Sequence, residues 1–574
     1  MLMFLKKTPN SKGRINLAIV DGYYDKTAKK TKHKVIESLG YLDELEKQYD
    51  DPIEYFTARA KQLTKEKKER QAPINFTFYD SDRLCTDDTS LRKNFGYAAL
   101  SQIYHELEID KFLTNRQRHS KEQFDVNTIM KMLVYSRLLF PASKKSSYDN
   151  REQFFEKTDY SLDDVYRCLS FFSKHKENLQ VWMNDKIKEN YGRDTSLIYY
   201  DVTNYYFESD DQNDFLRNGV SKEHRPNPIV QMGLFMDNNG IPITYELFAG
   251  NTNDCLTYRP NFGRIKKEFD LSRVISVADK GMTTGDNIWY TINTPTKDGY
   301  VFSMSVRGAN KEMKEYVLND EGYIWLGTEY KRKSRKYPRT IQVTSQSGRK
   351  LKKTVDEKQV VFWSEKYAKR AKADRTAALA KAADLAKNPG SYTRATSYGA
   401  AKYVKKIDYD KDTGEILTAS SVLEIDQAKL REEEELDGYY VLLTSELDET
   451  DDKIIDMYRG LWRIEESFKV TKSELEARPV YVWTRDHIEA HFLTCFVALT
   501  IARILETKLE RKYSIGKLLE SLSKASCTLI QQNYYLFDYY DDVLKDIGKV
   551  LDIDFSKRIR TLGEIKKVLA DTKK

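Results

Sequence analysis

Residues 195–306 constrain the fold most, because strand and turn patterns follow one another there in a fixed order. SLIYYDVTNYYF is β-branched and aromatic, and PIVQMGLFMDNNGIPITYELF has the pattern of a hairpin turned at residues 238–240. Residues 257–269 suit a short helix, and RVISVADKGM and YVFSMSV have the pattern of two more strands. Three antiparallel strands, a helix and two further strands predict a mixed α/β sheet.

Two aspartates lie within or at the end of these predicted strands, where ligand-binding residues are often found. Asp201 lies inside the first predicted strand, and Asp279 comes where the fourth ends. In open α/β sheets, ligands gather beyond the carboxyl ends of strands, near the point where the strand order reverses. We therefore expect Asp201 and Asp279 to converge although 78 residues separate them (279 − 201).

A third acid lies on a predicted helix over residues 458–472, YRGLWRIEESFKVTK. One face of this helix, at intervals of three and four residues, carries Tyr458, Leu461, Trp462, Glu465, Phe468, Lys469 and Lys472. Glu465 falls within this largely apolar and aromatic row, where a carboxylate is costly unless it is paired or binds a metal. Glu466 is rotated by about 100° and is expected to reach water.

Three clustered carboxylates would repel one another and bind protons unless a cation neutralises them. Mg²⁺ or Mn²⁺, which prefer oxygen ligands, are the expected partners of Asp201, Asp279 and Glu465. Two such ions about 4 Å apart activate a water or a 3′-hydroxyl in phosphodiester chemistry.

The regions before this sheet are basic or helical. Residues 1–40 hold nine Lys or Arg against three Asp or Glu, and a hairpin turned at Asp21-Gly22 is expected there. This hairpin is either an arm that grips phosphates or a solvated basic surface. One helix is predicted to end at Pro141 and the next to begin at Ser161, with Asp164 completing a capping box. The pair forms either a DNA-binding unit or an ordinary helical bundle.

Residues 307–437 interrupt the α/β pattern. KRKSRKYPR at 331–339 has six basic residues and no acid, so Lys331, Arg332 and Lys333 are candidates for phosphate contact. The acid run at 432–435 has the character of a solvated or flexible segment. GYYVLLTS at 438–445 returns the chain to the sheet, and a strong helix is predicted over 484–510.

The predicted organisation has six parts. They are a basic N-terminal region containing a β-hairpin (1–80), a helical, DNA-binding region (81–194), the first part of an α/β core (195–306), a β-rich insertion (307–437), the second part of the core (438–510) and a helical C-terminal region (511–574).

Composition excludes several classes. The net charge of +7 is weak evidence for an anionic partner, because 95 basic and 88 acidic residues nearly cancel. Five scattered cysteines without a CxxC pair argue against a zinc site or a disulfide framework. The longest apolar run, residues 492–502, is too short to span a bilayer, and no signal peptide is evident. We expect a cytoplasmic protein that does not bind membranes.

The sequence resembles bacterial insertion-sequence DDE transposases with a β-rich insertion before the last acid. That subgroup has a helix signature of Tyr, Arg, Glu and Lys. Tyr458, Glu465 and Lys472 match it, and the residues around the acid, WRIEE, are close to those of the family at this place. Leu461 occupies the arginine position, where Arg459 or Arg463 is expected to supply the charge. YYDVTNYYFE and ADKGM resemble the segments around the first and second acids.

The resemblance implies an RNase H-like catalytic core interrupted by the insertion, with Asp201, Asp279 and Glu465 binding two Mg²⁺ or Mn²⁺ ions. It implies that Tyr458 and Lys472 contact DNA phosphates, although a core tyrosine and a solvated lysine are the alternatives. The partners would be double-stranded transposon ends and target DNA, bound by a homodimer in a synaptic complex near the nucleoid. A nuclease of the same fold without strand transfer, or an inactive transposase-derived DNA-binding protein, are the competing interpretations.

Two further signals are open. His487 and His491 lie four residues apart on one helix, but the glutamate between them is misplaced for a zinc protease, so packing or a DNA-facing role is expected. Trp462 and Trp483 are either core residues or aromatics that stack on a displaced base.

Overall fold

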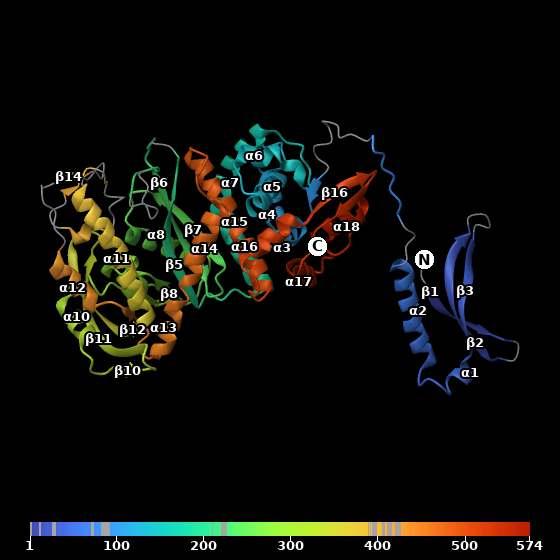
Figure 1. Ribbon diagram of the computed structural model, residues 1–574, viewed down its shortest axis with the longest axis horizontal. Coiled ribbons are helices and arrows are strands. Elements are labelled where there is room, and N and C mark those ends of the chain that lie inside the picture. Colours follow the sequence, from blue (N-terminus) through green and yellow to red (C-terminus); the bar gives the residue numbers. More distant parts are fainter. Residues whose placement is uncertain are drawn as a thin grey trace. The chain divides into compact units, whose positions relative to one another are not determined.

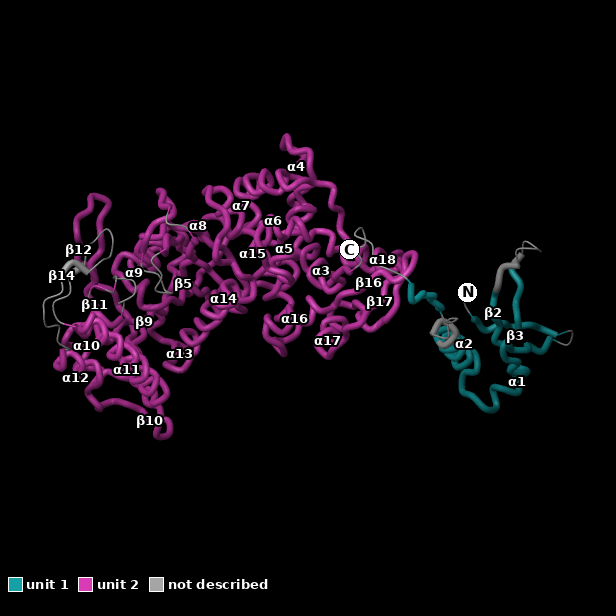
Figure 2. Tube along the Cα trace, turned by 45° about the horizontal axis from the view of Figure 1, so that its top comes forward, with its two compact units in different colours: residues 1–84 teal, residues 85–574 magenta. Residues whose placement is uncertain are grey.

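The computed structural model describes residues 3–10, 13–25, 30–69, 74–81, 92–208, 211–219, 227–388, 390, 392, 399–404, 408–409, 416–418 and 426–574. The chain divides into two compact units, Met1–Leu84 and Cys85–Lys574 (Figure 2). Each unit has its own buried core.

The first unit is a three-stranded antiparallel sheet with a helix on one face. Its elements are β1 (Met3–Pro9), β2 (Ile15–Asp25), β3 (Lys30–Tyr41), α1 (Leu42–Leu45) and α2 (Pro52–Glu69). Leu17 of β2 packs against Phe56 of α2 in this core. The expected turn at Asp21-Gly22 is wrong, since β2 continues through it and Gly22 pairs with His33. Gly22 lacks the positive φ that a two-residue Asp-Gly turn requires.

The second unit is built on a large mixed sheet. Within the described residues its order is β10-β11-β12-β15-β9-β8-β5-β6-β7. The strands are β5 (Leu197–Tyr206), β6 (Ile229–Asp237), β7 (Pro242–Ala249), β8 (Ile275–Ala278), β9 (Gly299–Met304), β10 (Ile324–Trp325), β11 (Tyr330–Thr344), β12 (Lys350–Ser364) and β15 (Tyr439–Thr444). β5, β6 and β7 pair antiparallel, whereas β8 runs parallel to β5 and β9 parallel to β8. The predicted mixed α/β sheet is therefore confirmed.

Different helices cover the two faces of this sheet. One face packs against α13 (Asp451–Arg459), α14 (Trp462–Ser473) and α15 (Arg485–Lys508), and we call it the α14 face. The opposite face packs against α8 (Asp254–Glu268) and α9 (Gly285–Ile292). Alternation along β5 sends Tyr199 and Tyr205 to the core on the α14 face and Tyr200 and Val202 to the core on the other.

The interrupting segment extends the sheet. β12 pairs with β15, and β11 pairs with β12 along its whole length, so these strands lengthen the main sheet at one edge. The segment also holds α10 (Lys311–Leu318), α11 (Glu365–Lys387), the two-stranded pair β13 (Asp408–Tyr409) and β14 (Ile416–Thr418), and α12 (Gln427–Glu435). The acid run on α12 is not simply solvated, because Glu433 accepts from Lys402 and Tyr403 and Glu434 pairs with Arg375.

The helical region before the sheet contains α3 (Tyr97–Glu106), α4 (Ile109–Arg118), α5 (Val126–Leu139), α6 (Lys144–Asp149) and α7 (Leu162–Tyr191). Two predictions are confirmed here: α5 ends just before Pro141, and Ser161 forms a capping box with Asp164. Helices α3, α5 and α7 pack on α15, and α4 and α6 pack on α5 and α7, so this region forms a helical bundle (Figure 1). DNA binding by this region stays a prediction.

The C-terminal region was predicted to be helical, but it also contains three strands. It contains α16 (Ile515–Lys524), β16 (Ser526–Gln531), β17 (Tyr534–Phe537), α17 (Asp542–Leu551), β18 (Ile559–Thr561) and α18 (Leu562–Asp571). β16 pairs with β4 (Arg92–Asn94), so a small sheet joins the two ends of the second unit. These strands are three to six residues long, too short for a clear alternation in sequence.

In the part of the chain that the structure describes, one helix, α15, is long and apolar enough to cross a membrane. Its apolar residues are buried inside the second unit, as in the core helix of a globular protein.

Candidate active site

The strand register brings two of the three predicted acids to neighbouring positions. Tyr200 of β5 pairs in parallel with Ala278 of β8, so Asp201 and Asp279 follow side by side where β8 ends. Both aspartates point to the α14 face by strand alternation, as Tyr199 and Val277 do. The parallel β5–β8 pair explains how residues so distant in sequence meet.

Asp279 is held in place by hydroxyl groups. Ser303, buried on β9, donates to its Oδ1 at 2.8 Å. The Tyr458 hydroxyl lies 3.4 Å from the same oxygen. Burial, and then the charge of Asp279, raise the pKa of Tyr458, so this phenol keeps its proton and donates it. Sequence reasoning missed Ser303; its only signal was a small polar residue in the apolar strand YVFSMSV.

The predicted helix over 458–472 is broken into α13 and α14. The backbone N–H groups of Leu461, Arg463 and Ile464 bond to carbonyls three residues back, a tighter turn than the α-helix makes. A Cβ on Gly460 would lie 1.9 Å from the Tyr199 hydroxyl, so only glycine lets the chain pass this ring. Tyr458 therefore belongs to α13, whereas Glu465 and Lys472 belong to α14.

The apolar environment expected for Glu465 was wrong, and Glu466 reaches water only in part. Glu465 is exposed, as are its neighbours Trp462 and Lys469, whereas α14 turns Ile464 and Phe468 into the core. Glu466 is only partly exposed and accepts from the buried Arg503 at 3.0 Å. Glu466 thus helps to hold α14 against α15, whereas Glu465 faces solvent.

Helix α14 runs alongside β5 in the same direction. Arg463 donates to the Tyr199 hydroxyl at 3.3 Å near the start of α14, and Thr471 bonds to the Tyr205 hydroxyl at 2.8 Å near its end. Glu465 lies between these contacts on the helix, as Asp201 does on the strand. Figure 1 shows α14 beside β5.

The donors on this face suit a hard divalent cation, since carboxylate oxygens are the preferred ligands of Mg²⁺ and Mn²⁺. Asp201 and Asp279 supply neighbouring carboxylates, and the hydroxyls on Asp279 Oδ1 leave Oδ2 for another partner. In the described ranges, however, no three His, Cys, Asp or Glu side chains are gathered closely enough to hold a metal ion. The structure therefore brings together two of the predicted acids and not the third.

The basic residues near the acids differ in availability. Arg459 is half exposed, pairs with Asp456 at 3.3 Å and lies over the Tyr330 ring. Arg463 is turned inward between Tyr199 and Trp462. Leu461, at the arginine position of the family signature, is buried in the core, which explains why an apolar residue stands there.

Lys472, the last residue of the signature, lies over the ring of Tyr205 at 5.5 Å, which keeps it on the α14 face together with Glu465.

The expectation that Lys331 and Lys333 contact phosphates needs correction. Both are buried on β11, within 4.4 Å of the ring of Tyr323. Lys331 donates to Asp320, and Lys333 to the Asn319 carbonyl. Arg332 pairs with Asp452 of α13. The run KRKSRKYPR is a strand, so its cations alternate between the two faces and find partners within the fold.

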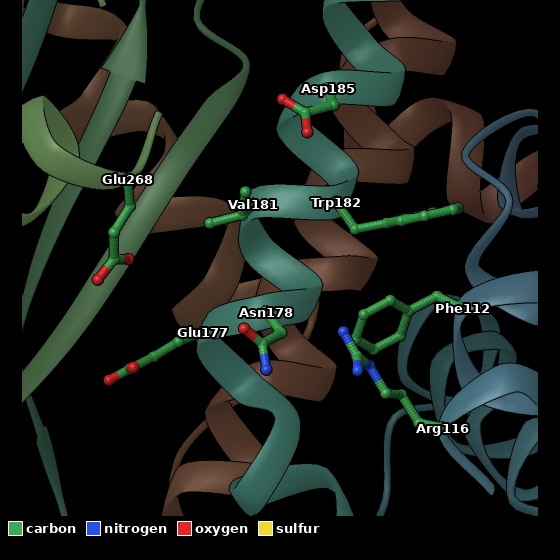
Figure 3. Close-up of a pocket in the computed structure, with 8 residues that line it drawn as sticks. All are labelled: Phe112, Arg116, Glu177, Asn178, Val181, Trp182, Asp185 and Glu268. Carbon is green, nitrogen blue, oxygen red and sulfur yellow. The ribbon is translucent and has the colours of Figure 1, made fainter. Parts of the chain in front are cut away.

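Other signals lie away from the acids. An open pocket of about 430 Å³ is lined by residues of α4, α7 and α8, namely Phe112, Arg116, Glu177, Asn178, Val181, Trp182, Asp185 and Glu268 (Figure 3). None of the predicted site residues lines it. His491 is a packing residue, since it is buried and bonds to Lys144 and the Ala477 carbonyl. Trp462 and Trp483 are each about half exposed, so neither is a core residue.

Comparisons with known proteins identify two regions. Residues 5–74 match the N-terminal domain of IS1634 family transposases, and residues 217–501 match the transposase DDE domain. The second match includes Asp279 and Glu465 and begins after Asp201. A search of curated proteins gave no match.

Among solved structures, similarity is found to a piggyBac transposase synaptic complex with hairpin DNA, at 8% identity and a TM-score of 0.34, covering 83% of this chain and 85% of the other. A Mos1 transposase paired-end complex with the left transposon end is 11% identical, with a TM-score of 0.11, covering 42% and 63%. Scores this low do not establish a shared fold.

Proposed function

The chain belongs to the insertion-sequence DDE transposases, and from this we propose that Asp201, Asp279 and Glu465 form the site at which it cuts and joins DNA. The observation that carries the proposal is that Tyr200 of β5 pairs with Ala278, the last residue of β8, so that Asp201 and Asp279 each directly follow a member of this pair. Glu465 is preferred to Glu466 as the third acid because Glu466 is engaged by Arg503.

An RNase H-like core is supported by the strand order. Three antiparallel strands (β5, β6, β7) are followed by two strands parallel to the first (β8, β9), with β5 between β6 and β8. We propose that residues 195–306 and 438–510 form this core, that 307–437 is the insertion, and that 1–80, 81–194 and 511–574 flank it.

Asp201, Asp279 and Glu465 would hold two Mg²⁺ or Mn²⁺ ions, which would supply Lewis-acid chemistry at the scissile phosphate. The chain's own part is positional. Ser303 and Tyr458 fix Oδ1 of Asp279 and so orient the carboxylate. Arg503 donates from two of its nitrogens to the Ser467 hydroxyl, which fixes the first turns of α14 and hence the level of Glu465 beside β5.

The reaction proposed at this site has two steps. Water attacks the phosphorus at a transposon end, forming one P–O bond and releasing the 3′-hydroxyl as the other breaks. That hydroxyl then attacks a phosphorus of target DNA and displaces another 3′ oxygen. Because two ends must be joined together, we propose a homodimer bound to the terminal inverted repeats, acting in the cytoplasm at the nucleoid.

The test replaces the acids one at a time as Asp201→Asn, Asp279→Asn and Glu465→Gln, with Glu466→Gln as the matched control. Cleavage of a labelled terminal repeat in Mg²⁺ should be lost in the three site variants and kept in the control. Normal cutting by the site variants would overturn the assignment. A pre-cut end that is not joined to target, despite cleavage of intact ends, would favour a nuclease. A wild-type protein that binds DNA without cutting would favour an inactive descendant.

A further inference from the structure

Helix α11 presents a row of basic side chains to solvent. Its exposed basic side chains are Lys366, Lys369, Arg370, Lys372, Lys381 and Lys387. Two of them form ion pairs within the helix, Lys369 with Glu365 at 2.8 Å and Arg370 with Asp374 at 4.0 Å. Exposed ion pairs of this kind stabilise a fold little, so a stronger anion displaces them readily.

A different basic residue anchors the helix. Arg375 is buried and donates to both carboxylate oxygens of Asp437 at 2.7 and 2.6 Å, just before β15 begins. Ala382 and Leu385 are buried in a small core with Tyr403. The inward side of α11 is therefore fixed to the sheet, and the exposed cations are not needed to hold it there.

The exposed side has a spacing that suits a phosphate backbone. Lys366, Arg370, Ala373, Ala377 and Lys381 recur at intervals of three and four residues, which places them on one stripe. We call these residues the α11 stripe. The cations of the stripe lie at its two ends, and the alanines lie between them. A bulky anionic partner can therefore approach the middle of the helix closely while its negative charges meet the cations at the ends.

The stripe begins beside the proposed site. Tyr367, next to Lys366, packs on Tyr440 of β15 with ring centroids 5.0 Å apart. Burial and then Tyr367 raise the pKa of Tyr440, and the charges of Arg370 and Asp279 both reach this phenol. Tyr440 lies two residues before Leu442, which pairs with Ser303 of β9 in the core of the α14 face, so the start of α11 lies over the same face as Asp279.

We propose that the α11 stripe binds the phosphate backbone of duplex DNA and guides it to the acids on the α14 face. The inference rests on the proposed function and names the protein surface its substrate follows. It replaces Lys331 and Lys333, which are buried, with cations that are exposed. Duplex DNA is the occupant that the charge favours, because a continuous row of phosphates matches cations spread over several turns of helix.

The main experiment measures DNA binding by full-length protein carrying Lys366→Gln, Arg370→Gln and Lys381→Gln together. Glutamine keeps the helix propensity of the replaced residues, so α11 should stay folded, as circular dichroism checks. Each lost phosphate contact should reduce the slope of log affinity against log salt by about 1 and weaken binding about fivefold at 0.15 M salt. The probe is a duplex with the element's terminal repeat and its flanking DNA.

The control removes the same charge elsewhere, as Lys545→Gln, Lys549→Gln and Lys566→Gln on α17 and α18, where these lysines are exposed. The control should bind with the wild-type slope. Equal loss in both triple variants would overturn the proposal, because the effect would then be one of net charge. An unchanged slope in the α11 variant would overturn it as well.

A photo-crosslinking amino acid at Ala377 tests the contact directly. It should crosslink to the duplex, whereas the same probe at Lys549 should not. A crosslink from Ala377 to protein alone would show that a second copy or another segment covers the stripe, and would overturn the proposal. Because the acids are intact in all these variants, failure here leaves the cleavage test of the proposed function unaffected.

Discussion

Replacing Ser303 with alanine should weaken metal binding without disturbing the fold. Ser303 is buried and donates a 2.8 Å hydrogen bond to Oδ1 of Asp279. A hydrogen bond to a charged group contributes about 1.5–3 kcal/mol, and each 1.4 kcal/mol is tenfold in an equilibrium constant. If that bond holds Asp279 in its binding orientation, Ser303→Ala should raise the metal dissociation constant by about 10- to 100-fold, the range usual for residues that orient metal ligands.

The assay is direct Mn²⁺ binding by electron paramagnetic resonance, together with the Mg²⁺ concentration that half-saturates cleavage. Ser276→Ala is the matched control, since Ser276 is buried on β8 and points to the opposite face of the sheet. Tyr458→Phe should have a smaller effect than Ser303→Ala, because its contact is longer at 3.4 Å. If Ser303→Ala binds Mn²⁺ as the wild type does, Ser303 does not position a ligand.

Three other predictions concern residues around the site and the core. Glu465→Gln should abolish cleavage with an unchanged melting temperature, because Glu465 is exposed, whereas Glu466→Gln should lower the melting temperature and keep cleavage; the reverse pattern would exchange their roles. Arg503→Met should cost about 3–5 kcal/mol because it leaves Glu506 buried and unpaired, and adding Glu506→Leu should recover most of that loss; no recovery in chemical denaturation would refute the pairing. Burial lowers the pKa of Lys144 to about 7, so between pH 7 and 10.5 the unfolded chain binds a proton that the folded chain does not, and this group makes stability rise with pH. Lys144→Met should therefore flatten the rise of the melting temperature with pH, and an unchanged slope would contradict this reasoning.

The sheet was predictable because its signal is local. Alternation, the Asn238–Gly240 turn and the apolar strand leading to Asp279 each lie within about ten residues, and they specify the strands and much of their order. The short strands β16 to β18 escaped prediction because they are only three to six residues long, and because β16 pairs with β4, more than 400 residues away. The extension of the sheet by β11 and β12 was not evident for the same reason.

In the candidate site, too, the features that depend on local sequence were predictable and those that depend on distant partners were not. Strand position alone was enough to select Asp201 and Asp279. Glu465 was chosen over Glu466 from a continuous helical row, but Gly460 interrupts that row, and what distinguishes the two acids in the structure is the pairing of Glu466 with Arg503. Periodicity within one helix carries no information on a partner from another.

The burial of Lys331 and Lys333 could not be predicted for a related reason. Their burial depends on the Tyr323 ring and on backbone carbonyls of the preceding loop, which no local count of charge reveals.

Metal-directed backbone cleavage tests most directly whether Asp201, Asp279 and Glu465 share one divalent-cation site. Fe²⁺ bound in place of Mg²⁺, with ascorbate and peroxide, generates hydroxyl radicals that cut only the nearby chain. If the three acids share this site, the DNA-bound protein should give three sets of fragments that end near residues 201, 279 and 465. Excess Mg²⁺ and Asp279→Asn should each suppress all three sets. Cleavage near 201 and 279 but never near 465, or cleavage elsewhere in the chain, would contradict a shared site.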